Sequence, residues 1–276
     1  MTGQKRDKLN QLQWLLPEGA VAEAAWLEAR GYPRSLRKHY LDRGWLASPG
    51  RGLFTRPGPP LRWESVVYSL QSVMAYPVLV GGRTALELEG FAHYPRAEGP
   101  AEVHLYTEEK PPAWLDLLPL EARFVRRAAS RLFPEGALAA ELDRARGGER
   151  PAASGSVQAH VWGPSHQPIL ISAPERAVLE LLDELPGRET FEQVDALFDG
   201  LTSLRPQRLQ ALLVACRSVK VKRLFFWFAR RRRHAWLSRL DESAVDFGSG
   251  KRALVPGGKL DPRYLITVPE AMHGDR

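Results

Sequence analysis

Four residues in one short stretch have side chains that could contact DNA bases: Arg34, Ser35, Arg37 and Lys38. Arg can donate two parallel hydrogen bonds to guanine in the major groove, and Ser and Lys can reach base edges or phosphates. Base contact requires these side chains to project from the N-terminal part of a helix that enters the groove. These residue types therefore predict a recognition helix, which neighbouring elements must hold in place.

The surrounding sequence predicts those elements. Leucines at helical spacing predict a first helix over 5–16, and a second helix is expected over 20–30. A third helix over 34–43 carries the four candidate residues, with a proline at its start and a glycine at its end. Two short helices joined by a turn that contains glycine are typical of a helix-turn-helix.

A basic hairpin is expected after the third helix. Residues 45–56 contain two short stretches with strand character around Ser48-Pro-Gly-Arg-Gly52, a segment rich in turn residues. A hairpin in this position is typical of a winged helix, in which Arg51 and Arg56 would lie along the phosphate backbone. The alternative is a small helical module with a hairpin that holds another protein.

The charge of the chain is unevenly distributed. Its 276 residues include 39 Lys and Arg and 32 Asp and Glu, for a formal net charge of +7. Residues 1–60 have a net charge of +5 and residues 61–200 have −8, whereas residues 201–240 contain eleven basic residues and no acidic one. Two basic blocks of this kind are expected of a protein that meets polyphosphate.

The composition excludes several classes of protein. With 44% hydrophobic residues and eight Trp, the chain can bury a core, so a disordered or fibrous protein does not fit. A membrane span and a secretory signal are not expected, which favours a cytoplasmic protein. The single Cys216 excludes an internal disulfide and zinc sites with two thiolates, and its apolar surroundings indicate a buried packing residue.

The second basic block lies mainly on a predicted helix over 221–240. An apolar stripe that includes Phe225 and Phe228 would leave Phe226, Trp227 and the basic residues on other faces. Arginine beside exposed aromatic side chains suits phosphate contact and base stacking, so RNA is one candidate partner. The alternative is that the block neutralises the acidic middle of the same domain. The basic residues assigned to this surface are Lys220, Lys222, Arg223, Arg230, Arg231 and Arg233.

One further predicted helix carries several carboxylates. Ser172 and Glu175 are expected to cap it, and Glu180, Asp183 and Glu184 to form a solvated acidic face on it. Because no cluster of His or Lys accompanies them, they do not indicate acid–base catalysis.

Three segments of the chain have a distinctive order of residues. They are VGGRTALELEGFAHY, KVKRLF and GGKLDPRYLITVP. Together with the hairpin segment, they resemble the AbiEi family of antitoxins of bacterial type IV toxin–antitoxin systems. The resemblance implies an N-terminal winged helix that represses its own operon at inverted repeats of double-stranded DNA. It also implies a C-terminal domain that counteracts a nucleotidyltransferase toxin without forming a stable complex with it.

The glycine pair Gly81-Gly82 also resembles the opening motif of nucleotidyltransferases. Between a predicted strand and a predicted helix, it could hold a phosphate at the helix N-terminus. In nucleotidyltransferases a strand with two aspartates follows and binds two metal ions. Here that strand carries Glu102 and His104, so the carboxylate pair is missing and no catalytic residue, metal site or cofactor is predicted. The alternative for the glycines is a buried strand packed closely on a helix.

The predicted fold is α+β. It comprises a winged helix-turn-helix domain over 1–60 and a larger mixed α/β domain over 61–276, and the boundary could lie as late as 95–100. The second domain would be a degenerate nucleotidyltransferase-like scaffold. The leading functional hypothesis is a non-enzymatic antitoxin and transcriptional repressor. The alternative is an RNA-binding or RNA-modifying enzyme, either a nucleotidyltransferase or a nuclease.

Overall fold

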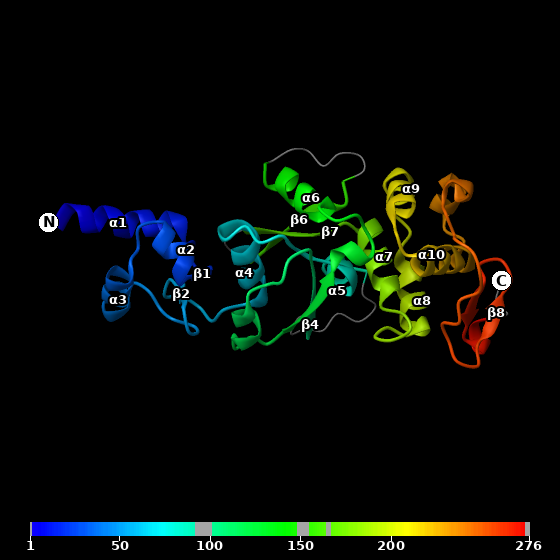
Figure 1. Ribbon diagram of the computed structural model, residues 1–276, viewed down its shortest axis with the longest axis horizontal. Helices are drawn as coiled ribbons and strands as arrows, with labels where there is room; N and C mark the ends of the chain where they lie inside the picture. Colours follow the sequence, from blue (N-terminus) through cyan, green and yellow to red (C-terminus); the bar gives the residue numbers. More distant parts are fainter. Residues whose placement is uncertain (1, 92–100, 148–154, 164–166, 274–276) are drawn as a thin grey trace.

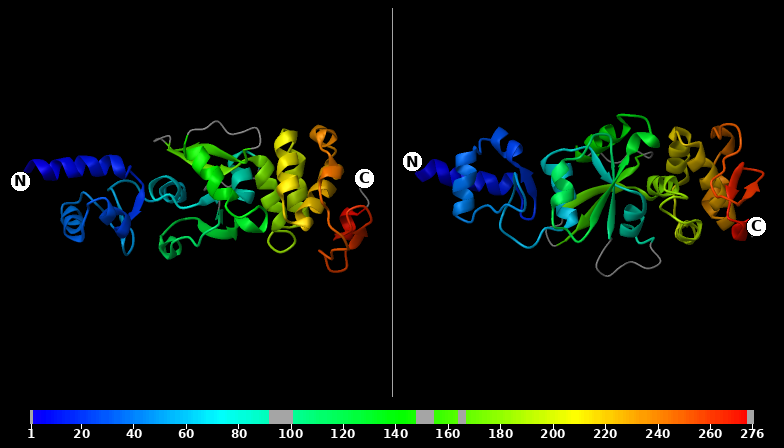
Figure 2. Two further views of the ribbon diagram at one scale, coloured as in Figure 1. Left: turned by 45° about the horizontal axis from the view of Figure 1, so that its top comes forward. Right: turned by 60° about the horizontal axis from the view of Figure 1, so that its bottom comes forward.

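The computed structural model describes residues 2–91, 101–147, 155–163 and 167–273. The molecule is elongated, with N-terminal helices at one end, a five-stranded sheet in the middle, and C-terminal helices and a hairpin at the other end (Figure 1, Figure 2). The prediction of a chain that mixes helices and sheets is therefore confirmed. The late alternative for the domain boundary, 95–100, lies outside the described residues.

The N-terminal end contains three helices and a short sheet. The helices are α1 (Thr2–Leu15), α2 (Ala24–Ala29) and α3 (Arg34–Asp42). The strands β1 (Val21–Glu23) and β2 (Leu53–Thr55) pair in antiparallel orientation. The predicted second helix is therefore shorter than expected, because its first turn is a strand that pairs with residues far along the chain.

A small hydrophobic core holds these elements together. Leu12 from α1, Leu16 just after it, Leu27 from α2 and Tyr40 from α3 are buried in it, together with Phe54 from β2. Each helix contributes side chains from one face only, as expected of amphipathic surface helices. The outer faces of these helices remain available to solvent.

The central sheet has the strand order β5-β4-β3-β7-β6. Its strands are β3 (Val78–Val80), β4 (Glu102–Thr107), β5 (Arg123–Ala128), β6 (Val157–Trp162) and β7 (Gln167–Ser172). β3 is antiparallel to β4 and parallel to β7, β4 is parallel to β5, and β6 is antiparallel to β7. The sequence predicts these five strands over 78–80, 102–106, 122–125, 157–162 and 169–171. The bounds of β3 and β6 agree, and those of the other three differ by one to three residues.

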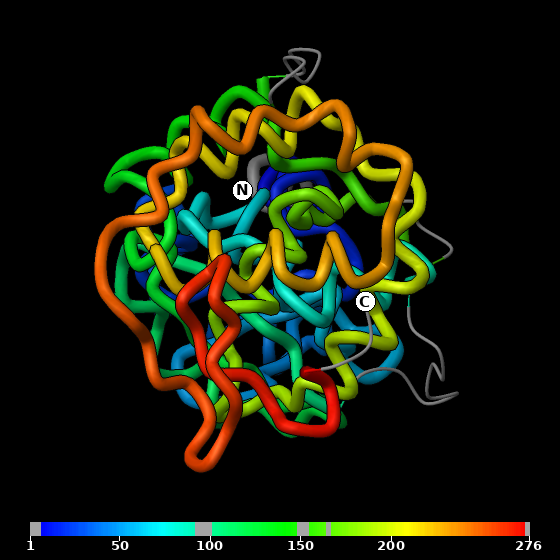
Figure 3. Tube along the Cα trace, turned by 90° about the vertical axis from the view of Figure 1, so that its right-hand side faces the viewer, coloured from blue at the N-terminus to red at the C-terminus, as the bar shows by residue number. Residues whose placement is uncertain are grey.

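Helices cover the sheet and connect its strands. α5 (Gly82–Leu88) follows β3 directly and packs against α7 (Pro174–Asp183), which follows β7. The remaining elements of this part are α4 (Trp63–Tyr68), the π-helical η1 (Ser69–Val73), the 3₁₀ segments η2 (Ala113–Leu117) and η3 (Ala129–Arg131), and α6 (Ala137–Arg146). Seen from the C-terminal end, later helices and the final hairpin lie in front of this part (Figure 3).

The C-terminal part contains three helices and a hairpin. The helices are α8 (Phe191–Gly200), α9 (Pro206–Ala215) and α10 (Val219–Arg232). The strands β8 (Lys259–Asp261) and β9 (Ile266–Val268) pair in antiparallel orientation. The short 3₁₀ segments are η4 (Ala235–Arg239), η5 (Glu242–Ala244) and η6 (Glu270–Met272). α10 packs against α7 and α8.

Two predictions for this part are wrong in detail. The helix expected over 221–240 ends at Arg232, because Arg233 adopts a left-handed backbone conformation with φ of 52°. The sequence also predicts a closing strand pair over 245–254 and 264–268, but the first of these strands does not form, apart from an isolated bridge between Arg252 and Ile266. Within the described ranges, no helix is long and apolar enough to cross a membrane.

Candidate nucleic-acid interface

α3 presents a polar face to solvent. Arg34, Ser35 and Lys38 are exposed, whereas Leu36 is half-buried and Tyr40 is fully buried. Because a helix has about 3.6 residues per turn, residues four apart lie on the same face. The structure therefore brings three of the four predicted base-contacting side chains together on the outer side of α3.

Arg37 does not belong to that face. Only 6% of it is exposed, and its Nη1 donates to the carbonyl oxygens of Tyr32 (2.6 Å) and Ala24 (3.3 Å). Both terminal nitrogens lie 3.3 Å from the Glu28 carboxylate, and the guanidinium lies 5.5 Å from the centre of the Phe54 ring. The prediction that Arg37 points outward is wrong. At about 3.6 residues per turn it falls between the two inward-facing positions 40 and 41.

The segment after α3 forms a small wing. Ala47 and Thr55 exchange both of their backbone hydrogen bonds, at 2.8 and 2.9 Å, which closes the hairpin. Gly52 near the tip has a φ of 75°, in the left-handed region that favours glycine. Arg51 is exposed at the tip, and Arg56 is half-buried just after β2. The wing thus has one full strand and one bridge in place of the two strands expected.

Two further side chains lie beside this surface, although the sequence analysis gave them no role. Arg43 is exposed at the C-terminal end of α3. Trp45, which is 40% exposed, packs edge-on against the rings of His39 (5.8 Å) and Tyr40 (5.4 Å). Arg43 ends the third predicted helix and Trp45 begins the predicted hairpin, and these positions are the signal that could have identified them.

The second basic block is largely internal. Lys222 and Arg223 are buried within α10, and Arg223 donates to the carbonyl oxygens of Phe247 (2.9 Å) and Gly250 (2.7 Å). Lys220 is half-buried, and its Nζ donates to two carbonyl oxygens at the C-terminal end of α7, at 2.6 and 2.8 Å. The prediction that these three side chains form an open surface is wrong, because the segment after residue 246 and α7 cover this part of α10.

The arginines at the end of α10 face carboxylates. Arg230 pairs with Glu242, and Arg231 lies 3.3 Å from Asp195. The neighbouring Arg232 pairs with Asp195 at 2.6 Å and Asp199 at 3.1 Å, and Arg233 is exposed at the helix end. These pairs agree with the alternative in which the block neutralises acidic residues of the same region.

The aromatic residues of α10 are also buried. Phe226 is fully buried against Phe247 and Tyr264, and Trp227 packs on Phe191 and Phe228. The prediction that Phe226 and Trp227 lie on an exposed face of the helix is therefore wrong. Base stacking, one of the two reasons to expect RNA at α10, has no support there.

The glycine pair contacts a carboxylate from the same chain. Gly82 N donates to Glu180 Oε2 at 2.8 Å, and a Cβ atom on Gly81 would collide with the same carboxylate and with the Tyr106 ring. Glu180 is fully buried and also accepts from Ser172 Oγ, at 2.8 Å. Of the two alternatives for the glycines, the close packing of a strand on a helix is confirmed, and a phosphate at this place would meet the Glu180 carboxylate at the start of α5.

The same contacts overturn two predictions for α7. Ser172 donates to Glu180 and does not cap the helix, whose N-cap residue is Ala173. Glu180 pairs with Arg176 at 2.7 Å, and Glu184 pairs with Arg127, both in buried surroundings. Glu180 and Glu184 are therefore buried, and the prediction of a solvated acidic face is wrong.

Glu102 and His104 lie two residues apart on the same face of β4, the strand next to the edge strand β5. His104 is buried, and its Nε2 lies 3.9 Å from the Glu102 carboxylate. Burial and the nearby charge of Arg127 lower the pKa of His104, which favours the neutral imidazole. Among the described residues, no group of three or more His, Cys, Asp or Glu side chains is placed to hold a metal ion.

Cys216 is buried, as expected, and burial raises the pKa of its thiol to about 11.

Two family models match the chain and define its class as transcriptional regulators. The AbiEi antitoxin N-terminal domain matches residues 5–96, and the AbiEi antitoxin of type IV toxin–antitoxin systems matches residues 101–269. The chain therefore belongs to the AbiEi family of antitoxin transcriptional regulators.

One solved structure is similar in fold. The RV2827C protein from Mycobacterium tuberculosis is 15% identical and superimposes with a TM-score of 0.50, over 90% of this chain and 85% of that chain. At this identity the similarity concerns the fold alone. A search of curated proteins found no match.

Proposed function

We propose that the chain represses its own operon by binding inverted repeats of double-stranded DNA through a winged helix-turn-helix. The observation that supports this most strongly is the outer face of α3, where Arg34, Ser35 and Lys38 are exposed together. Their position near the start of α3 suits contact with base edges in the major groove. The exposed Arg51 in the wing would bind the phosphate backbone beside the groove, with Arg56 following it.

Arg37 has a different role in this proposal. Because its guanidinium is buried against Tyr32 and Glu28, it would hold α3 in position without touching DNA. Sequence preference would then depend on residues 34, 35 and 38.

A binding experiment with promoter DNA tests the repressor proposal. The wild-type chain is titrated against the upstream promoter and against a scrambled duplex at physiological salt. A specific regulator is expected to bind its operator roughly a thousandfold or more tightly than non-specific DNA. Equal affinity for both duplexes would contradict the proposal.

We further infer that the C-terminal part counteracts a nucleotidyltransferase toxin in the cytoplasm, without catalysis and without a stable complex. Membership of the AbiEi family supports the antitoxin role. A degenerate nucleotidyltransferase-like scaffold is supported by the strand, glycine pair and helix at β3 and α5, followed by Glu102 and His104 in place of two aspartates. Co-expression of the toxin gene with residues 61–276 tests this inference, and growth arrest despite a folded fragment would contradict it.

Two domains, over 1–60 and 61–276, remain our proposal for the organisation of the chain. The separate N-terminal core supports it. The two family models meet later, between residues 96 and 101.

A further inference from the structure

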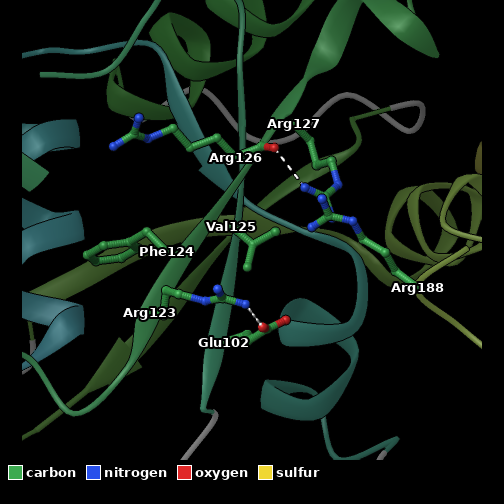
Figure 4. A pocket seen from close by; sticks show the side chains of 7 residues that line it. All are labelled: Glu102, Arg123, Phe124, Val125, Arg126, Arg127 and Arg188. Atoms are coloured by element: carbon green, nitrogen blue, oxygen red, sulfur yellow. Dashed lines mark hydrogen bonds and ion pairs between the residues drawn. The ribbon is translucent and has the colours of Figure 1, made fainter. Parts of the chain in front are cut away.

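An open depression of about 590 Å³ lies at the edge of the central sheet, on β4 and β5 (Figure 4). Its lining includes four arginines and one carboxylate: Arg123, Arg126, Arg127, Arg188 and Glu102. It lies on the sheet in the middle of the molecule, whereas α3 and the wing form the N-terminal end (Figure 1). An arginine-rich hollow at this place is not explained by operator binding through α3.

The fold places three of these guanidinium groups on one side of the sheet. Alternate residues of a strand face the same side, so Arg123 and Arg127 project together from the edge strand β5. Glu102 lies opposite Arg123 in the register of β4 and β5. Arg188 reaches the same side from the segment between α7 and α8, and Figure 4 shows its guanidinium beside that of Arg127.

Two of the four arginines are committed to carboxylates. Arg127 is almost buried and donates from Nε and Nη2 to both oxygens of Glu184. Arg126 extends to the other side of β5 and pairs with Asp116. Arg127 therefore reaches the depression as half of an ion pair, which brings a guanidinium group but no net charge to it.

The other two are available to a ligand. The side chain of Arg188 is 62% exposed, and its Nε lies 3.9 Å from Glu184, which is too long for a hydrogen bond. The side chain of Arg123 is 74% exposed, and its partner Glu102 is also largely open to solvent. Such an exposed ion pair contributes little, so an anion of higher charge can replace Glu102 as the partner of Arg123.

The chemistry of the lining selects the ligand class. Guanidinium groups match the oxygens of phosphate in a two-pronged geometry, and they keep their charge at every physiological pH. The volume falls within the range of small-molecule sites, which is roughly 300–1,000 Å³. Because charged side chains dominate the lining, an extended polyanion fits better than an apolar group.

We propose that this depression binds an oligophosphate chain, either inorganic or carried by a nucleotide. Arg123 and Arg188 supply the net positive charge that holds the chain, Arg127 lies beside them in its ion pair with Glu184, and Glu102 opposes binding. Guanidinium groups supply the positive charge, so binding does not require a divalent cation. The depression shares no residue with the proposed operator-binding face of α3, so each proposal can fail without the other.

Calorimetric titration of the full-length chain tests the proposal. Tripolyphosphate, nucleoside triphosphates and inorganic monophosphate are titrated at low ionic strength in the presence of EDTA. We expect saturable binding of one triphosphate per chain and much weaker binding of monophosphate. Tighter binding of a nucleotide than of tripolyphosphate would identify the nucleotide as the ligand, and equal affinities would identify the phosphate chain itself.

Substitutions with opposite expected effects distinguish a site from general attraction. Arg123→Gln and Arg188→Gln are each expected to lower the affinity about tenfold, because each removes charge-assisted hydrogen bonds. Glu102→Gln is expected to raise the affinity, since it removes the competing carboxylate. The control is Arg131→Gln, whose side chain is 61% exposed beside Asp183 and outside the lining.

Three outcomes would overturn the proposal. They are the absence of saturable binding, an equal loss of affinity for Arg188→Gln and Arg131→Gln, and weaker binding by Glu102→Gln. Thermal unfolding of each variant shows whether it is folded, and we expect all four to melt like the wild type because the substituted side chains are largely exposed.

Discussion

Arg37 connects α3 to the elements beside it. Its guanidinium bonds to the Tyr32 carbonyl oxygen before α3, pairs with Glu28 on α2 and lies over Phe54 on β2. A planar group with five donors can satisfy partners in several directions at once, which lysine cannot do. One buried side chain thus fixes the angle at which α3 presents its outer face.

Substitution of Arg37 is expected to affect stability and binding without changing the number of phosphate contacts. Arg37→Gln should lower the free energy of unfolding by about 1–3 kcal/mol, because it leaves buried carbonyl oxygens without a donor. Operator affinity should fall, while the dependence of log Kd on log salt stays as in the wild type. Urea unfolding and salt-dependent anisotropy titrations measure these quantities.

The matched control for Arg37 is Arg34→Gln on the outer face of the same helix. If Arg34 contacts DNA, this variant should lose operator affinity, whereas its free energy of unfolding should change by less than about 0.5 kcal/mol. A stable Arg37→Gln protein whose salt dependence is weaker than that of the wild type would show that Arg37 touches phosphate after all.

The buried pair of Glu184 and Arg127 gives stability a pH dependence. Burial raises the pKa of Glu184, but the hydrogen bonds and charge of Arg127 outweigh it and hold the pKa below its ordinary value. Because the folded pKa is the lower one, the ionised carboxylate stabilises the fold above the unfolded pKa of about 4.3. This contribution is lost as the pH falls through the folded pKa.

Glu184→Gln is therefore expected to destabilise the chain most at neutral pH. The loss should be about 2–3 kcal/mol near neutral pH, and it should shrink as the pH falls from the unfolded pKa of about 4.3 through the lower folded pKa of Glu184. Urea unfolding at several pH values measures the difference. The exposed Glu192→Gln on α8 serves as control, and a loss for Glu184→Gln that is independent of pH would contradict the assignment.

At the scale of elements, α10 anchors the C-terminal segment through hydrogen bonds from one side chain. Arg223 donates to the carbonyl oxygens of Phe247, Gly250, Gly248 and Leu265, at 2.9, 2.7, 3.3 and 3.3 Å. The loop and the hairpin after it have few other regular hydrogen bonds, because β8 and β9 have only three residues each. One guanidinium therefore holds much of this segment against the helix.

Arg223→Lys should loosen that segment selectively. Lysine keeps the charge but cannot donate to carbonyl oxygens from a planar fork. Faster amide hydrogen exchange is expected over 247–268, with unchanged exchange in α7 and the central sheet. Arg217→Lys, an exposed change close in sequence, should leave the exchange pattern as it is. Uniformly faster exchange across the whole chain would contradict a local anchoring role.

The sequence predicts those helices and strands that are determined by neighbouring residues, and it misses those that depend on contacts with distant segments. Helical spacing predicts α3 and most of its exposed residues, and runs of apolar, β-branched residues predict strands such as β3 and β7. β1 escapes prediction because Val21-Ala-Glu23 is compatible with a helix, and only pairing with Leu53–Thr55 makes it a strand. Arg37, Arg223 and Glu180 were misplaced for the same reason, since their buried partners come from other segments.

At the scale of the whole molecule, the positive charge on the surface lies elsewhere than the sequence alone suggests. Eleven basic residues between 201 and 240 suggest a second nucleic-acid surface. In space, many of them are buried or face carboxylates such as Glu175, Asp195 and Glu242. The smaller basic block at the N-terminal end is the one whose side chains gather on an open helix face.

The most direct test compares two triple variants with the same change of charge. One replaces Arg34, Lys38 and Arg51 by Ala, and the other replaces the exposed Arg205, Arg217 and Arg239 by Ala. Affinity for the chain's own promoter is measured by anisotropy at physiological salt. We predict that the first variant loses its preference for promoter over scrambled DNA, while the second keeps it. Equal loss in both variants would contradict operator recognition through α3 and the wing.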